Sequence, residues 1–285
     1  MGDKARPSSA QRSPLTSEME RSGVMGESLK RKRGHAAILA ANPFCIYCGG
    51  TERATTIDHM PPRIMFRGKH RPGQFEFPSC DNCNQRTKTT DQFAAYIGRL
   101  YPDPTTATDQ DDVRKILIGL KNNLPGVLQE MYVGRAGQKL ATKRVRPPDS
   151  GGFLRLDGPI ATKHLEIFGC KLGLAMHFEA TGNALPRNGG IAIRVFSNVE
   201  ALENKIPDTL AKLLPGPQTL RQGTWDVADQ FQYSVRLTDD KTMGLFFASF
   251  RFSFAVVAAT SIDQSSLSAM WPRVFSPGEP WKVTK

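Results

Sequence analysis

Two pairs of cysteines, each with a C-x2-C spacing, constrain this 285-residue chain more than any other feature of its sequence. The pairs are Cys45 with Cys48 and Cys80 with Cys83, and 31 residues separate them. Together they supply four thiolates, the tetrahedral set of soft ligands that structural zinc prefers. We therefore predict a structural Zn2+ site formed by these four cysteines. A redox dithiol pair and buried free thiols are the alternatives.

The segment between the two pairs, residues 49–79, is polar and rich in glycine and proline. It buries too little apolar surface to fold without help, so metal binding would supply much of its stability. A thiol redox protein would place a C-x2-C motif of low pKa at the start of a helix within a βαβ pattern. Neither cysteine pair has that context, which favours zinc binding over redox chemistry.

Asp58 and His59 are adjacent inside this segment, and two prolines follow them. Proline cannot extend a hydrogen-bond ladder, so a strand is expected to end here. A carboxylate beside an imidazole offers an oxygen ligand for a hard cation and a base that can deprotonate water. Asn84, which directly follows the last cysteine, can complete the coordination of such a cation. The sequence thus indicates a phosphodiester-hydrolysing site.

The helix expected to begin near Asn84 carries two further polar side chains on the same face, Lys88 at i+4 and Asp91 at i+7. We expect supporting roles for both, with Lys88 and Asp91 converging with Asp58 and Asn84 around one phosphate. Taken singly, each residue has a simpler explanation, because asparagine at a helix start is a common cap. The combination is what indicates a site.

These motifs resemble the HNH endonucleases, also called the ββα-metal or His-Me finger fold. The resemblance rests on the first cysteine pair, then Asp58-His59 followed by prolines, then the second cysteine pair with Asn84 directly after it. It covers about residues 44–101. It implies a metal-dependent endonuclease with His59 as general base, Asp58 and Asn84 as ligands of a catalytic Mg2+ or Mn2+, and the four cysteines as the structural zinc site.

The mechanism implied by this resemblance begins with His59 taking a proton from the water that attacks phosphorus in line, and it leaves a 5′-phosphate and a 3′-hydroxyl. Activity is then expected to rise through about pH 6.5, the ordinary pKa of histidine. The chain departs from the family pattern at Phe75, where a middle asparagine is usual, so Gln74 or Glu76 is expected to orient His59 instead. Many members also carry the helix lysine one residue before the position of Lys88.

The charge balance favours a polyanionic partner. The chain has 38 Lys+Arg against 27 Asp+Glu, a formal net charge of +11, and residues 1–101 carry 16 basic and nine acidic side chains. We predict nucleic acid as the partner and DNA as the substrate. The alternative function is a non-catalytic zinc-finger module that binds nucleic acid through phosphate contacts. Only the nuclease needs Asp58, His59 and Asn84 together.

The predicted fold class is α+β, with a small zinc-stapled ββα-metal finger followed by a mixed α+β domain. We divide the chain into a disordered basic tail (1–34), an HNH nuclease domain (35–101), a helix and linker (102–152) and an α+β domain of unknown role (153–285). Apolar spacing at Leu165, Phe168, Leu172 and Ala175 predicts a largely buried helix in the last domain. The other elements expected there are a strand over 189–196, a helix over 199–214, and strands over 231–237 and 245–257.

Composition also bears on the location of the chain. The N-terminus has no apolar h-region, and the most hydrophobic stretch, Gly244 to Ile262, carries Arg251 and several serines. We therefore expect no membrane association and a cytoplasmic, reducing compartment. Cys170 is expected to be a small buried hydrophobe, while His35 and His70 are expected to be solvated. The sequence gives no indication of oligomeric state.

Overall fold

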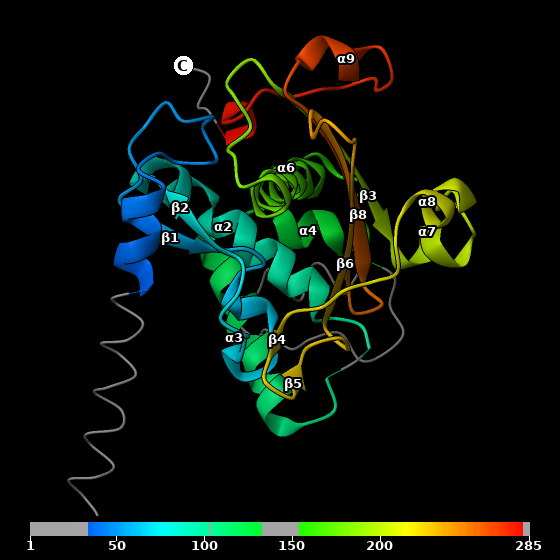
Figure 1. Ribbon diagram of the computed structural model, residues 1–285. Coiled ribbons are helices and arrows are strands. Elements are labelled where there is room, and N and C mark those ends of the chain that lie inside the picture. Colours follow the sequence, from blue (N-terminus) through cyan, green and yellow to red (C-terminus); the bar gives the residue numbers. More distant parts are fainter. Residues whose placement is uncertain (1–33, 103, 133–153, 282–285) are drawn as a thin grey trace, which may run out of the picture.

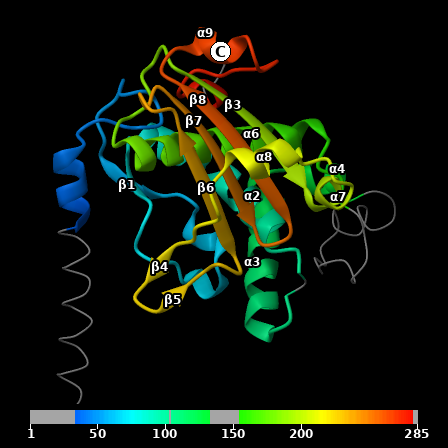
Figure 2. The ribbon, with the colours of Figure 1, turned by 45° about the vertical axis from the view of Figure 1, so that its right-hand side comes forward.

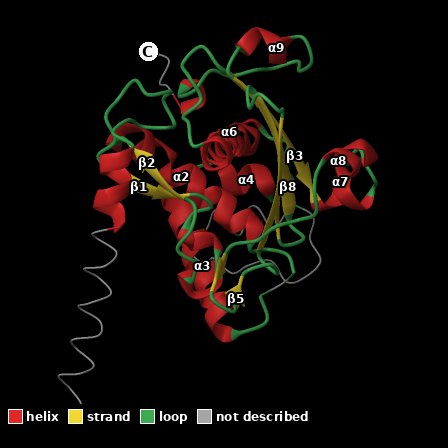
Figure 3. Cartoon of the chain, viewed as in Figure 1, coloured by secondary structure: helices red, strands yellow, loops and turns green. Residues whose placement is uncertain are grey.

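In the computed structural model, helix α6 (Pro159–Thr181) lies at the centre of the fold, between helix α2 (Asp81–Gly98) and a four-stranded antiparallel sheet (Figure 1). The structure describes residues 34–102, 104–132 and 154–281. The predicted disordered tail lies outside these ranges except for Gly34, as does most of the second half of the predicted helix and linker over 102–152. The mixed α+β class predicted from the sequence is confirmed (Figure 3).

Helix α6 is apolar on nearly all of its faces, which explains its central position. It begins at a proline, whose missing N–H is not needed in the first turn, and ends at Gly182 in a left-handed conformation with φ of 75°. Gly173 allows the sheet to approach closely, since a Cβ atom there would lie 2.8 Å from Cβ of Ala258. The predicted buried helix is thereby confirmed, and it packs on both α2 and the sheet.

The sheet has the strand order β3-β8-β7-β6, and every neighbouring pair is antiparallel. Figure 2 shows the four strands side by side with α6 behind them. Strand β8, which has a neighbouring strand on each side and packs on α6, is buried along its whole length. The strand bounds are β3 (Gly190–Ser197), β6 (Phe231–Leu237), β7 (Met243–Phe250) and β8 (Phe254–Ser261).

A small hairpin precedes α2 and forms the ββα unit. Strand β1 (Thr56–His59) pairs antiparallel with β2 (Glu76–Ser79), so that Asp58 lies opposite Phe77 and His59 lies opposite Glu76. The chain between the strands forms two 3-10 turns, η1 (Arg63–Met65) and η2 (Arg67–Lys69). The strand ends at His59, as the two following prolines predict.

The remaining elements are short or peripheral, with α3 the longest of them. They are α3 (Ala107–Asn123), α4 (Val127–Met131), α7 (Asn198–Leu202), α8 (Asp208–Leu213), β4 (Arg221–Gln222), β5 (Trp225–Asp226), α9 (Gln264–Ser268) and η3 (Glu279–Trp281). One cluster of buried apolar side chains includes residues of the ββα unit, α3, α6 and the sheet. Among the described residues, no helix is both long and apolar enough to cross a membrane.

Two expectations from the sequence are corrected. The helix predicted over 199–214 is two short helices, because Pro207 has no N–H for a helix interior and instead caps the start of α8. The strand predicted over 245–257 is the β7–β8 hairpin, with a tight turn at residues 251–253. Arg251 adopts φ of 49° in that turn, and the hydroxyl of Ser253 donates to the carbonyl of Tyr101 at 2.8 Å.

Candidate functional site

The four cysteines come together between the hairpin and the start of α2. Cys80 caps the N-terminus of the helix by accepting a hydrogen bond from the backbone N–H of Cys83 at 3.4 Å. Cys45 and Cys48 lie in the turn before β1, and the four sulfur atoms all lie within 4.8 Å of one another without forming a disulfide. Four free thiols at this spacing fit a structural metal ion such as zinc. The indole N–H of Trp281 donates to Sγ of Cys83 at 3.4 Å, so the indole ring covers the four cysteines.

Asp58 points from β1 into the protein interior, where both of its oxygens have partners. The hydroxyl of Tyr47 donates to Oδ2 at 2.6 Å, and Nζ of Lys171 lies 3.2 Å from Oδ1 and 3.1 Å from Oδ2. Burial, and then the charge of Asp58, raises the pKa of Tyr47 well above its usual range, so the phenol keeps the proton it donates. Only 7% of the Asp58 side chain is exposed.

Lys171 joins Asp58 to Asp91. Its Nζ lies 2.7 Å from Oδ2 of Asp91, so one ammonium from α6 bridges a carboxylate of β1 and a carboxylate of α2. Burial alone would lower the pKa of Lys171, but the two carboxylates raise it above its ordinary value. Burial raises the pKa of Asp91 to about 6, although the charge of Lys171 acts in the opposite direction. The ammonium of Lys171 thus supplies the positive charge between these two carboxylates.

The other predicted residues on α2 have separate surroundings. Asn84, in the first turn, donates from Nδ2 to Oγ1 of Thr56 at 3.4 Å. Lys88 is exposed, whereas Asp91 is buried beside Lys171. The structure therefore brings Asp91 near Asp58 and leaves Lys88 at the surface.

His59 points to the opposite face of β1 from Asp58, as alternation along a strand requires. Its Nε2 lies 3.5 Å from Oε1 of Glu76, the residue opposite it in the hairpin. Burial, and then the positive charge of Arg71, lowers the pKa of His59 to about 4. The imidazole is consequently neutral near pH 7.

Asp58, His59 and Asn84 thus have three different sets of partners. As arranged, Asp58 does not present the open carboxylate that a Mg2+ ligand needs, because it is buried and already paired with an ammonium. Glu76 takes the position beside His59 that the sequence assigned to Gln74 or Glu76, whereas Gln74 accepts a hydrogen bond from the backbone N–H of Arg221.

Sequence reasoning missed Tyr47, Lys171 and His35 at this site. A lysine among the apolar residues of the helix predicted around Leu172 was a signal for Lys171, since a buried ammonium needs an acidic partner. His35, expected to be solvated, lies 3.5 Å from Oε2 of Glu76. No sequence motif around His35 indicates this contact.

Comparison of the chain with protein-family models, with curated proteins and with solved structures found no match. The resemblance to HNH endonucleases therefore rests on the sequence motifs alone.

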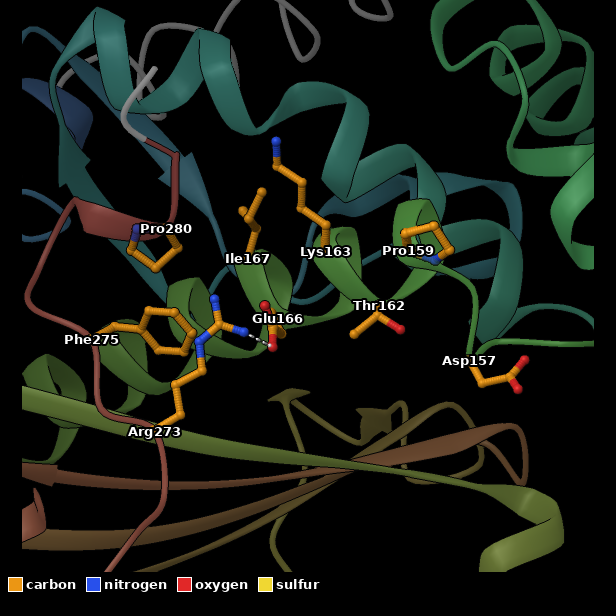
Figure 4. A pocket seen from close by; sticks show the side chains of 9 residues that line it. All are labelled: Asp157, Pro159, Thr162, Lys163, Glu166, Ile167, Arg273, Phe275 and Pro280. Carbon is orange, nitrogen blue, oxygen red and sulfur yellow. Dashed lines mark hydrogen bonds and ion pairs between the residues drawn. The ribbon is translucent and has the colours of Figure 1, made fainter. Parts of the chain in front are cut away.

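A separate hollow lies beside the first half of α6 (Figure 4). Arg273 reaches across it and bonds Oε1 of Glu166 at 2.6 Å. The same guanidinium lies 4.6 Å from the ring centre of Phe275. These contacts pair Glu166 with Arg273 inside the hollow.

Proposed function

We propose that this chain is an HNH-type endonuclease that hydrolyses phosphodiester bonds, with DNA as its substrate and His59 as the general base. What supports the proposal most is the position of His59, which ends β1 of a ββα unit with one cysteine pair in the turn before β1 and the other at the start of α2. A half-buried, neutral imidazole at this position is able to accept a proton.

The residues around His59 suggest how the base is oriented. A proton on Nε2 faces Glu76, which leaves the lone pair of Nδ1 to take a proton from water. The nearby carboxylate stabilises the positive charge that forms on the ring. In this role Glu76 is a positioning residue for His59.

Coordination of Mg2+ or Mn2+ by Asp58 and Asn84 stays a prediction, and it requires Lys171 to release Asp58. Such an ion would stabilise negative charge on the phosphate during the reaction. The four cysteine thiols need a reducing environment to remain metal ligands, so we infer a cytoplasmic location.

Incubation of supercoiled plasmid with the protein and Mg2+ or Mn2+ tests the proposal. We expect nicked or linear DNA with wild-type protein, and a loss of cleavage of about 100-fold or more in His59→Ala, because general-base catalysis typically contributes that much. His70→Ala is the matched control, since His70 is exposed and lies outside the site. Equal cleavage by wild type and His59→Ala would exclude His59 as the base.

The second candidate is a non-catalytic module that binds nucleic acid, and the pairing of Asp58 with Lys171 and Tyr47 specifically favours it. In that case the plasmid stays intact with every divalent ion, while wild type and His59→Ala bind DNA equally. Binding should weaken steeply with salt, because phosphate contacts release counterions. A gel-shift series at increasing salt measures this.

A further inference from the structure

A second group of potential metal ligands lies on the face of the hairpin opposite Asp58. His59 and Glu76 come from the paired strands β1 and β2, and His35 comes from the helical segment over residues 34–41. Nε2 of His35 lies 3.5 Å from Oε2 of Glu76, while Nε2 of His59 lies 3.5 Å from Oε1. One carboxylate therefore faces two imidazole nitrogens, one with each of its oxygens.

The three side chains converge. One ligand atom from each of them lies within 4.8 Å of the other two. The two imidazole rings have centres 6.0 Å apart and are nearly perpendicular, at 87°, so they do not stack. The rings meet edge to face, and in this arrangement Nε2 of each ring faces the carboxylate of Glu76.

His35 supplies an independent observation. Its Nε2 is shielded from solvent and makes no hydrogen bond to any residue in the part of the chain that the structure describes. A shielded polar nitrogen that makes no hydrogen bond, although the carboxylate of Glu76 lies 3.5 Å away, is unfavourable. A metal ion at the shared point would coordinate this nitrogen.

We propose that His35, His59 and Glu76 bind a divalent transition-metal ion such as Zn2+ or Co2+, at a site distinct from the four cysteines. Two imidazoles and a carboxylate are a donor set that suits such ions. With metal–ligand bonds of about 2.0–2.2 Å, the ligand atoms of a tetrahedral site lie roughly 3.3–3.6 Å apart. The two separations of 3.5 Å to Glu76 fall within this range.

This site has a consequence for catalysis that rests on the proposed function. A neutral imidazole carries one proton, so metal binding at Nε2 of His59 places that proton on Nδ1. The ring then has no lone pair with which to accept a proton from water. Metal binding here and general-base catalysis by His59 exclude each other, which makes the ion an inhibitor of hydrolysis.

Titration of Co2+ into protein that already holds one zinc ion per chain tests the binding itself. We expect a second ion per chain by elemental analysis and calorimetry, with a visible spectrum that lacks the charge-transfer bands of thiolate ligands. His35→Ala and Glu76→Gln should each weaken this second ion at least about tenfold and retain the first, because each removes one of only three ligands. His70→Ala should bind both ions as wild type does.

A wild-type stoichiometry that stays at one ion would overturn the site, as would variants that bind the second ion as tightly as wild type. A cleavage assay tests the consequence separately. Excess Zn2+ should slow cleavage by wild type much more than cleavage by His35→Ala. If the chain cleaves no nucleic acid, the proposed function fails while the metal stoichiometry still decides this inference.

Discussion

Nζ of Lys171 lies 3.1 Å from Oδ2 of Asp58, although 113 residues separate the two in sequence and both side chains are buried. The pair joins the ββα unit to the central helix α6. Because Asp91 shares the same ammonium, the three charges form one buried network with two negative groups and one positive group. The network is therefore sensitive to loss of its single cation.

Replacement of Lys171 by methionine should destabilise the protein strongly. It leaves the carboxylates of Asp58 and Asp91 buried without a counter-charge, and breaking a buried ion pair in this way typically costs about 3–5 kcal/mol. Unfolding in urea measures the change in free energy. Lys163→Met, at an exposed position on the same helix, should change it by no more than about 0.5 kcal/mol. Addition of Asp58→Asn to Lys171→Met should recover part of the loss, and no recovery would contradict the ion-pair explanation.

Removal of the metal should unfold the ββα unit. Cys80→Ser is expected to lose the bound zinc and the protection of amide hydrogens across residues 44–101, because the four cysteines join the turn before β1 to the start of α2. Native mass spectrometry measures the zinc, and hydrogen exchange measures the protection. Cys170→Ala is the control, since Cys170 is buried in α6 and lies outside the cysteine group. Full protection in metal-free Cys80→Ser would contradict a structural role for the ion.

His177 should make the protein less stable in acid. Burial lowers its pKa to about 4, and Oγ1 of Thr260 lies 2.8 Å from Nδ1. The unfolded chain therefore binds a proton below about pH 6.5 that the folded chain takes up only near pH 4. The free energy of unfolding should fall by about 3 kcal/mol as pH drops through this range. His177→Asn should lose this part of the pH dependence, whereas the exposed control His70→Asn should keep it.

Gly173→Ala should disturb the contact between α6 and the sheet. The added methyl group would lie 2.6 Å from Cδ1 of Ile191 and 2.8 Å from Cβ of Ala258. The side chain of Ile191 can rotate, but the Cβ of Ala258 cannot move without the strand. Overpacking of this kind typically costs about 1–3 kcal/mol, which thermal or urea unfolding would show. Gly216→Ala, where no atom lies within 4 Å of the new methyl group, is the matched control.

The cysteine cluster and the buried helix were predictable because local spacing specifies both. The C-x2-C motifs require no knowledge of the rest of the chain, and the apolar positions of α6 repeat along one segment. The predicted element bounds were wrong where a single residue interrupts a periodic pattern of apolar residues. Pro207 divides an otherwise helical segment, and the left-handed conformation of Arg251 turns one long apolar run into a hairpin.

The partners of Asp58 and His59 could not be predicted, because they depend on tertiary contacts. Alternation along a strand does place the adjacent side chains of Asp58 and His59 on opposite faces. It gave no indication that Lys171 would meet Asp58 or that His35 would meet Glu76, since neither pair lies within one element. Long-range pairing of charges has no periodic signature in a single sequence.

The ion pair between β1 and α6 also limits how the molecule can be divided. A fragment that ends at residue 101 would keep Asp58 and Asp91 but lose the ammonium that neutralises them, together with the indole that shields Cys83. Transfer of the ββα unit to another protein would therefore require that protein to have a lysine at the equivalent position. Evolution of this chain by simple exchange of its first third faces the same electrostatic obstacle.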